Sequence, residues 1–232
     1  MTAKEFLQSR QGKRMKNAFD EPFILECKPG LSELEIEALR QQRAVSDELA
    51  ELLSFTRGFT APDGEEVDFV GEPFGLEGIF RHPIALKHDG AGNFWVIDAA
   101  SETPDRIYFA CHDPAVALVF AQNYTDFLQQ ILGNIRLGKE DAVYDKCYAI
   151  WKRKAAKTLA ETQKRDAQLN AFAQTLEPGH LLIDLRKAKN GDGFAWGQLL
   201  NKRQPVPPTR HPTAELWAYK PPAALKPWWK FW

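Results

Sequence analysis

The chain has 232 residues, of which 44% are hydrophobic and 26% are charged, and its formal net charge is −1. These values exclude a disordered chain, and no apolar run approaches the roughly 20 residues that a membrane-spanning helix needs. The N-terminus lacks the apolar stretch of a secretory signal, so we expect a cytoplasmic protein with one domain and a sizeable extension.

The charge is divided unevenly along the chain. Residues 21–80 contain 14 acidic and 4 basic residues, so this segment has a net charge of −10 and the remainder has a net charge of +9. A nucleic-acid-binding surface needs concentrated positive charge, and an acidic segment of this size argues against one. Either the acidic segment is a solvated face or it meets a basic partner.

Two helices are predicted before any strand, after residues 1–24, which we expect to form an arm or a frayed helix. The first helix covers residues 31–42, with Ser32 and Glu35 as a capping box. The second covers residues 45–57 and starts at Ser46 or Asp47. The apolar stripes that should face the core are Leu31, Leu34, Ala38 and Leu39 in the first helix, and Val45, Leu49, Leu52 and Leu53 in the second.

Residues 60–78 are rich in glycine and proline and are predicted as a loop. This is the densest acidic stretch of the chain, and its acidic residues are Asp63, Glu65, Glu66, Asp68 and Glu72. We identify these five as the candidate partner-binding residues.

Three strands are predicted at 82–89, 92–99 and 106–112, and their short connections favour an antiparallel meander. The apolar residues of the second strand do not alternate with polar ones, which predicts a central strand covered on both faces. A helix at 123–132 should dock by one face, formed by Tyr124, Phe127, Leu128, Ile131 and Leu132.

The C-terminal extension is predicted as a long helix and short strands. Helical spacing runs over residues 139–176, with a polar stretch at 161–168 where the helix kinks or breaks. Residues 180–200 are typical of a hairpin whose turn is Lys-Asn-Gly-Asp-Gly. A proline-rich linker leads to a short edge strand at 214–219 and to an aromatic tail that ends at residue 232.

Three pieces of the sequence, in this order, resemble the SMI1/KNR4 family, also called the SUKH superfamily. They are "VSDELAELLSFTRGF" (45–59), "HPIALKHDGAGNFWVIDAAS" (82–101) and "VALVFAQNYTDFLQQIL" (116–132). The middle piece is the most specific. The resemblance implies an α+β domain over residues 25–137, in which helices flank an antiparallel sheet, followed by an extension at 138–232 that we expect to pack on it.

The resemblance also implies a function through protein binding, without catalytic residues. Bacterial relatives of this kind neutralise toxins, and fungal ones are scaffold-like regulators. We therefore expect an immunity protein whose acidic loop blocks the basic cleft of a toxin, a nuclease being one candidate. The alternatives are a scaffold that binds through its extension and, third, a small-molecule or metal-dependent enzyme.

The chemistry-bearing residues do not predict a catalytic site, a cofactor or a metal. Asp89 and Asn93 flank a glycine-containing turn and suit a structural Asx turn. His82, His88 and His112 lack the spacing of a metal motif. Cys111 and His112 are neighbours on a strand, so their side chains should point to opposite faces.

The cysteines and the aromatic tail complete the expectations. Cys27, Cys111 and Cys147 are odd in number and widely spaced, so we expect free thiols. The tail residues are Trp217, Tyr219, Trp228, Trp229, Phe231 and Trp232. A clasp packed back onto the domain is the favoured interpretation, with protein binding and membrane contact as alternatives.

Overall fold

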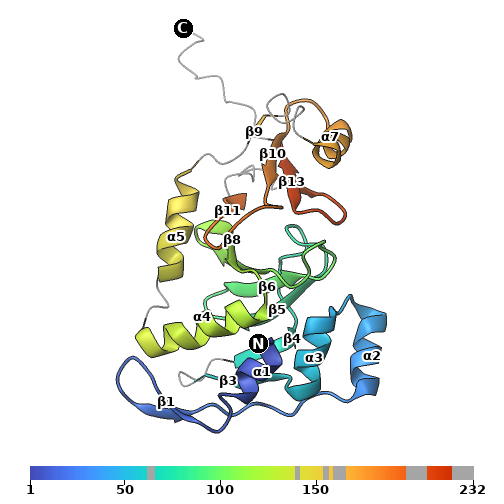
Figure 1. Ribbon diagram of the computed structural model, residues 1–232. Helices are drawn as coiled ribbons and strands as arrows, with labels where there is room; N and C mark the ends of the chain where they lie inside the picture. The colour runs from blue at the N-terminus through green and yellow to red at the C-terminus, as the bar shows by residue number, and fades with distance from the viewer. Residues whose placement is uncertain (62–65, 139–141, 154–156, 159–165, 197–207, 221–232) are drawn as a thin grey trace.

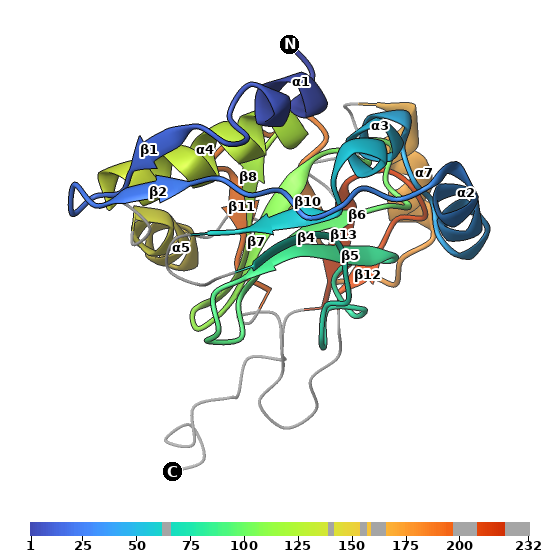
Figure 2. The same ribbon diagram turned by 90° about the horizontal axis from the view of Figure 1, so that it is seen from below.

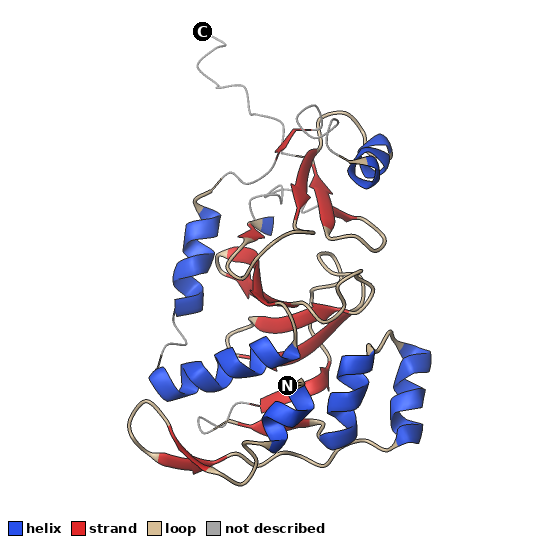
Figure 3. Cartoon of the chain, viewed as in Figure 1, coloured by secondary structure: helices blue, strands red, loops and turns tan. Residues whose placement is uncertain are grey.

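The computed structural model describes residues 1–61, 66–138, 142–153, 157–158, 166–196 and 208–220. Over these residues the protein has an α+β fold with six helices and a seven-stranded antiparallel sheet, and its C-terminal part builds a further four-stranded sheet (Figure 1). The predicted fold class is confirmed. Figure 3 shows the strands of the large sheet between the helices, and the N-terminal hairpin at the edge of the molecule.

The large sheet has the strand order β11-β8-β7-β6-β5-β4-β3, and all its pairs are antiparallel. Its strands are β3 (Gly58–Thr60), β4 (Glu66–Gly71), β5 (Pro83–His88), β6 (Phe94–Asp98), β7 (Ile107–His112), β8 (Ala115–Ala121) and β11 (Gly193–Phe194). The predicted meander and the central place of β6 are confirmed. Trp95 and Ile97 of β6 enter the core on one face, and Val96 enters a second core on the other.

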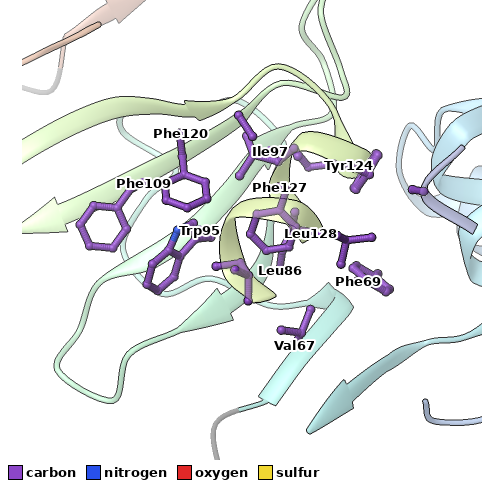
Figure 4. Close-up of a cluster of buried hydrophobic side chains, with 14 of the residues drawn as sticks. Val67, Phe69, Leu86, Trp95, Ile97, Phe109, Phe120, Tyr124, Phe127 and Leu128 are labelled. Carbon is purple, nitrogen blue, oxygen red and sulfur yellow. The ribbon is translucent and has the colours of Figure 1, made fainter. Parts of the chain in front are cut away.

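The first core lies between the large sheet and five helices. Most of its helical side chains come from α1 (Ala3–Gln8), α3 (Asp47–Phe55), α4 (Tyr124–Leu137) and α5 (Ala142–Trp151), and α2 (Glu33–Gln42) adds Ile36. Figure 2 shows α1, α3 and α4 along one side of the sheet, and Figure 4 shows side chains of α4 among those of the strands. The buried stripe of α4 is the predicted one, extended by Ile135.

Helix α2 (Glu33–Gln42) begins at Ser32, whose side chain and that of Glu35 form the predicted capping box. Its predicted stripe is wrong in part, since Leu34 is 83% exposed and Ile36 is the buried residue. The reason is its place at the margin of the fold, where it packs against α3 and only a narrow line of side chains is covered.

The first 24 residues differ from the expected arm. Phe6 and Leu7 of α1 are buried in the first core, and α1 contacts both α3 and α4. A two-stranded hairpin follows, formed by β1 (Arg14–Lys16) and β2 (Pro22–Ile24). These residues are therefore built into the domain, because Ala3, Phe6 and Leu7 lie at i, i+3 and i+4 and form one buried face of α1.

The opposite face of the large sheet carries a second core, to which the C-terminal part contributes. The sheet side supplies Val96, Tyr108, Ala110, Ala117 and Val119, and the C-terminal side supplies Ile183, Leu185, Phe194 and Trp217. Of the aromatic residues near the C-terminus, Trp217 is fully buried here and Tyr219 packs at the margin. Residues 221–232 lie outside the described part, so the clasp remains a prediction for the rest of the tail.

The four-stranded sheet corrects two predictions about the extension. Its order is β12-β13-β10-β9, with β9 (Lys157–Thr158), β10 (Leu181–Asp184), β12 (Thr209–Arg210) and β13 (Leu216–Tyr219). The predicted hairpin at 180–200 is wrong, because β10 pairs with β13 and β9 whereas β11 pairs with β8 of the large sheet. The predicted edge strand, β13, is an inner strand between β12 and β10.

The helix predicted over 139–176 with a kink or break at 161–168 is interrupted, but the interruption begins earlier than predicted and contains a strand. Helix α5 ends at Trp151, β9 follows, and α7 (Ala167–Gln174) begins after the N-cap Asp166. The predicted buried positions are correct within α5 and within α7. Between these two helices, the pairing of β9 with β10 overrides the helix propensity. No helix within the described residues is long and apolar enough to span a membrane.

Two buried ion pairs join the C-terminal part to the large sheet. Arg106 pairs with Glu215, and their side chains are 7% and 1% exposed. Arg210 pairs with Asp98 at 2.9 Å, and these side chains are 5% and 0% exposed. Buried charges are tolerated only when they are paired and hydrogen-bonded, so the two halves of the chain depend on each other.

Candidate functional site: two acidic surfaces

The predicted partner-binding residues lie on and beside a strand rather than in a loop. Asp63 and Glu65 fall outside the described residues, while Glu66 and Asp68 belong to β4 and Glu72 follows it. The loop predicted over 60–78 is therefore wrong at residues 66–71. The physical reason is an alternation in which Val67 and Phe69 are fully buried and the acidic side chains share the other face.

Each of the three described acidic residues has a basic partner in the same chain. The pairs are Glu66 with Lys28 at 3.0 Å, Asp68 with Arg57 at 3.1 Å, and Glu72 with Arg43. Exposed pairs of this kind contribute at most about 1 kcal/mol, so a partner can compete for them. The negative field of this surface is nevertheless weaker than the sequence suggests, because its charges are largely balanced locally.

A second acidic surface, which sequence reasoning missed, lies where α1, α3 and α4 begin. We call it the acidic hollow, a solvent-open depression of about 630 Å³. The residues that line it are Met1, Thr2, Asp47, Glu48, Glu51, Asn123, Thr125, Asp126 and Gln129. Four of these carry carboxylates, and the N-terminal ammonium of Met1 is the positive charge among them, so the hollow is acidic on balance.

The electrostatics of the acidic hollow differ from those of β4. Burial raises the pKa of Glu48, and the negative charges of Asp105 and Glu51 raise it further. Burial likewise raises the pKa of Asp105, against a hydrogen bond from Ser46 that lowers it, and Asp47 adds to the rise. Both shifts come first from burial, and the neighbouring carboxylates add to them.

The sequence held only a partial signal for this site. Asp47, Glu48 and Glu51 fall within two turns of one helix, where acidic residues are common because they complement the helix dipole. Asp126 lies in the first turn of α4, and Asp105, which interacts with Glu48 but does not line the hollow, lies in the connection after β6. Only the packing of α3 beside the sheet and α4 brings them near one another.

The turn between β5 and β6 has the geometry of the predicted Asx turn. Asp89 Oδ1 accepts hydrogen bonds from the backbone N–H groups of Ala91 at 2.9 Å and Asn93 at 3.1 Å. Gly90 and Gly92 have φ of +72° and +89°, which glycine adopts without strain. Asp89 Oδ2 also accepts from Asn93 Nδ2 at 2.5 Å and from the Tyr144 hydroxyl, which ties the turn to α5.

Replacing Asp89 by alanine is expected to lower the free energy of unfolding by about 1–3 kcal/mol, because Asn93 and Tyr144 lose a charged, partly buried acceptor. Partial burial raises the pKa of Asp89, but hydrogen bonds from Asn93, Tyr144 and the backbone outweigh it and leave the pKa lowered. This stabilisation is present above the usual aspartate pKa and is lost as the pH falls through the lowered value. Urea unfolding at pH 7 and at acid pH should show a difference between the two proteins that shrinks at low pH; a constant difference would contradict this account.

The candidate metal and nucleophile residues do not form a cluster. His82, His88 and His112 are exposed at strand ends, and Asn93 Oδ1 accepts from His112 Nδ1 at 2.9 Å. Within the residues that the structure describes, no three His, Cys, Asp or Glu side chains are close enough to hold a metal ion. Cys111 is buried in the first core, so its thiol and the exposed imidazole of His112 lie on opposite sides of the strand.

The described cysteines are free thiols, as predicted. Cys27 is half-buried, whereas Cys111 of β7 and Cys147 of α5 are fully buried and hydrogen-bonded to each other. This bond lowers the pKa of Cys111 and raises that of Cys147. The pair helps to seat α5 on the sheet.

A separate pocket of about 480 Å³ lies between α5, α7, β10 and β11. Its lining includes Arg186, which pairs with Asp184 at 2.7 Å and with Asp166 at 2.5 Å. The hydrogen bonds to these two carboxylates raise the pKa of Arg186. The charge of Arg186 is thus satisfied within the protein, and the pocket shows no convergent set of reactive groups.

No family model, curated protein or solved structure matches the chain.

Proposed function

We propose that this protein is a non-enzymatic binding protein of the SMI1/KNR4 type, an immunity protein that neutralises a cognate toxin by direct contact. The observation that carries the proposal is the common core of the three pieces that bear the resemblance. Leu52 of α3, Trp95 of β6 and Phe127 of α4 belong to one hydrophobic cluster. Helices flanking an antiparallel sheet are what the resemblance implies.

The charge distribution supports a basic partner. Residues 21–80 carry −10, and both acidic surfaces derive mainly from this segment. A negative surface steers a positively charged protein toward it and raises the association rate. The mechanism would be stoichiometric: the immunity protein covers the basic cleft of an enzyme that handles nucleic acid, and its carboxylates occupy the place of substrate phosphates.

Co-expression with a neighbouring toxin gene tests the proposal. If an adjacent gene encodes a protein with a toxic C-terminal domain, the full chain is expected to restore growth when both are produced. It should also form a one-to-one complex with a catalytically inactive toxin in size-exclusion chromatography. Failure of both with the product of the adjacent gene would favour the scaffold alternative.

Charge reversal then tests whether the β4 surface is the part of the protein that binds the toxin. Glu66→Lys with Glu72→Lys tests the β4 surface, and Glu33→Lys with Glu37→Lys on α2 is the control with the same charge change. If β4 is the interface, the first pair weakens toxin binding and reduces its dependence on salt more than the control does. Equal effects would remove the β4 residues from the interface.

A further inference from the structure

The loop between β4 and β5 presents an aromatic side chain to solvent. Phe74 is 87% exposed, more than any other large hydrophobic side chain of the described residues. The chain that follows is fixed to the protein, since Leu76, Ile79 and Phe80 are buried in the second core. The backbone N–H groups of Ile79 and Phe80 both donate to the Leu76 carbonyl at 2.9 Å. Phe74 therefore stays outside the core although the loop is anchored close to it.

The loop is held on both sides of Phe74. Gly75 follows with φ of +74°, a left-handed conformation that glycine adopts without strain. On the other side, Glu72 pairs with Arg43 at the end of α2. An exposed ring on a loop held at both ends is a favourable anchor for binding, because little conformational freedom is lost when it is buried.

A small depression lies beside Phe74. We call it the notch, a solvent-open depression of about 210 Å³. The residues that line it are Arg43, Glu72, Pro73, Glu77, Arg81, His82, Pro83 and Ile84. Pro73 directly precedes Phe74, so the exposed ring and the notch are neighbours on the surface. The two prolines, Ile84 and the aliphatic stems of the arginines offer apolar contacts that suit an aromatic ring.

Two opposite charges of the notch have no ion-pair partner. Arg43 and Glu72 pair with each other, whereas Glu77 and Arg81 are exposed. Neither Glu77 nor Arg81 is within ion-pair distance of an opposite charge among the residues that the structure describes. One surface thus combines an exposed ring, a depression next to it, and one unpaired charge of each sign.

We propose that the β4–β5 loop and the notch form the interface of a two-fold homodimer, in which Phe74 of each copy occupies the notch of the other. In a two-fold interface residue i of one copy meets residue j of the other, and j meets i. A ring beside a depression satisfies this condition, and so do Glu77 and Arg81, which pair across the axis. A second copy therefore supplies both the ring and the charges that the notch lacks.

The overall charge does not oppose this association. The net charge is −1 per chain, so two copies repel each other only weakly. The dimer is independent of the proposed function. Glu72 nevertheless belongs to both the notch and the β4 surface, so a partner that binds β4 competes with the second copy for it.

Sedimentation velocity of the full chain tests the dimer. The chain has a mass of 26.3 kDa. The weight-average mass should rise toward twice this value between about 1 µM and about 200 µM protein, because small interfaces associate weakly. Phe74→Asp is expected to weaken the dimer about tenfold or more, because a charge replaces the ring in the notch.

The matched control is Phe19→Asp, which replaces a phenylalanine that is 84% exposed in the turn between β1 and β2. It should associate as the wild type does. Both variants should keep the melting temperature of the wild type within about 1 °C, because neither ring is packed inside the protein. A change in association is then a property of the surface and not of folding.

Exchange of the two unpaired charges tests the pairing across the axis. Glu77→Arg and Arg81→Glu each place like charges opposite one another, and each should weaken the dimer about threefold or more. The double variant restores opposite charges and should recover most of the affinity. Recovery identifies a direct contact between copies, since an effect on the fold of one copy would not be reversed.

The outcomes separate the dimer from its alternatives. A mass of 26.3 kDa at every concentration, or equal association of the wild type and Phe74→Asp, would overturn it. If the wild type is monomeric and Phe74→Asp weakens binding of the adjacent gene's product, the loop serves a different protein and the second copy is wrong. If the chain dimerises as described and no toxin is neutralised, the dimer stands and the immunity function fails.

Discussion

Replacing Glu215 by glutamine is expected to lower the free energy of unfolding by about 3–5 kcal/mol. Glu215 is 1% exposed and faces Arg106, which is itself buried. Its other carboxylate oxygen accepts hydrogen bonds from Ser101 at 3.2 Å and from Thr103. Glutamine keeps the shape of the side chain but removes the charge, so the guanidinium of Arg106 remains buried without its counter-ion.

Urea unfolding followed by tryptophan fluorescence measures this loss. The control is Glu177→Gln, which breaks the exposed pair with Lys220, whose side chains are 74% and 59% exposed. The control should leave the unfolding midpoint where it is, because solvent already screens that pair. Similar effects of the two substitutions would show that the Arg106 pair is not desolvated in solution.

A double replacement distinguishes loss of the pair from loss of one partner. Arg106→Met with Glu215→Leu removes both charges and keeps apolar volume at the site. It should recover much of the stability that Glu215→Gln loses, because no buried charge is then left alone. A double variant as unstable as the single one would mean that the hydrogen bonds of Arg106 with Gln122 and the Leu185 carbonyl, which only the double variant removes, matter as much as the charge pairing.

The elements with strong local periodicity were predictable from the sequence. The stripe of α4 and the unbroken apolar run of β6 each contain enough information to assign both the element and its buried side. The Asx turn before β6 was predictable for the same reason, since its glycines and the hydrogen bonds to Asp89 all lie within residues 89–93.

Elements fixed by distant partners were not predictable. Strand β4 alternates correctly through Val67 and Phe69, but the glycines and prolines around it favoured a loop. Strand β11 follows a turn that suits a hairpin, yet Phe194 is buried in the second core and its strand pairs with β8. Whether each segment forms a strand, and with which partner, depends on which edge of the folded sheet is free to pair with it. The local sequence does not encode this.

The candidate site shows the same division. The five acidic residues of 63–72 were visible as a run, but the basic residues that pair with the described three are distant in sequence. The acidic hollow joins α3 to Asp126, which is more than 70 residues further along the chain. A run of charge was therefore a weaker guide than the placement of each charge and its partners, which only the fold reveals.

Replacing Trp217 by alanine is expected to cost about 3–5 kcal/mol of unfolding free energy. The side chain is fully buried in the second core, with its ring 5.0 Å from that of Phe194 and 6.2 Å from that of Tyr108. Its Nε1 donates to the Ile79 carbonyl at 2.8 Å, and the guanidinium of Arg210 lies 4.3 Å from the ring centre. Replacement by alanine therefore leaves a cavity and also leaves the Ile79 carbonyl without its hydrogen-bond donor.

Circular dichroism should follow this unfolding, because the substitution removes one of the fluorescent tryptophans. The control Tyr148→Ala removes an aromatic side chain that is 50% exposed on α5 and should change stability little. Since Trp217 belongs to the C-terminal part and Ile79 to the part that resembles the SMI1/KNR4 domain, a large loss would mean that the two fold as one unit. Equal small losses would mean instead that residues 25–137 are stable without the extension, and partner binding could then be assigned to either part alone.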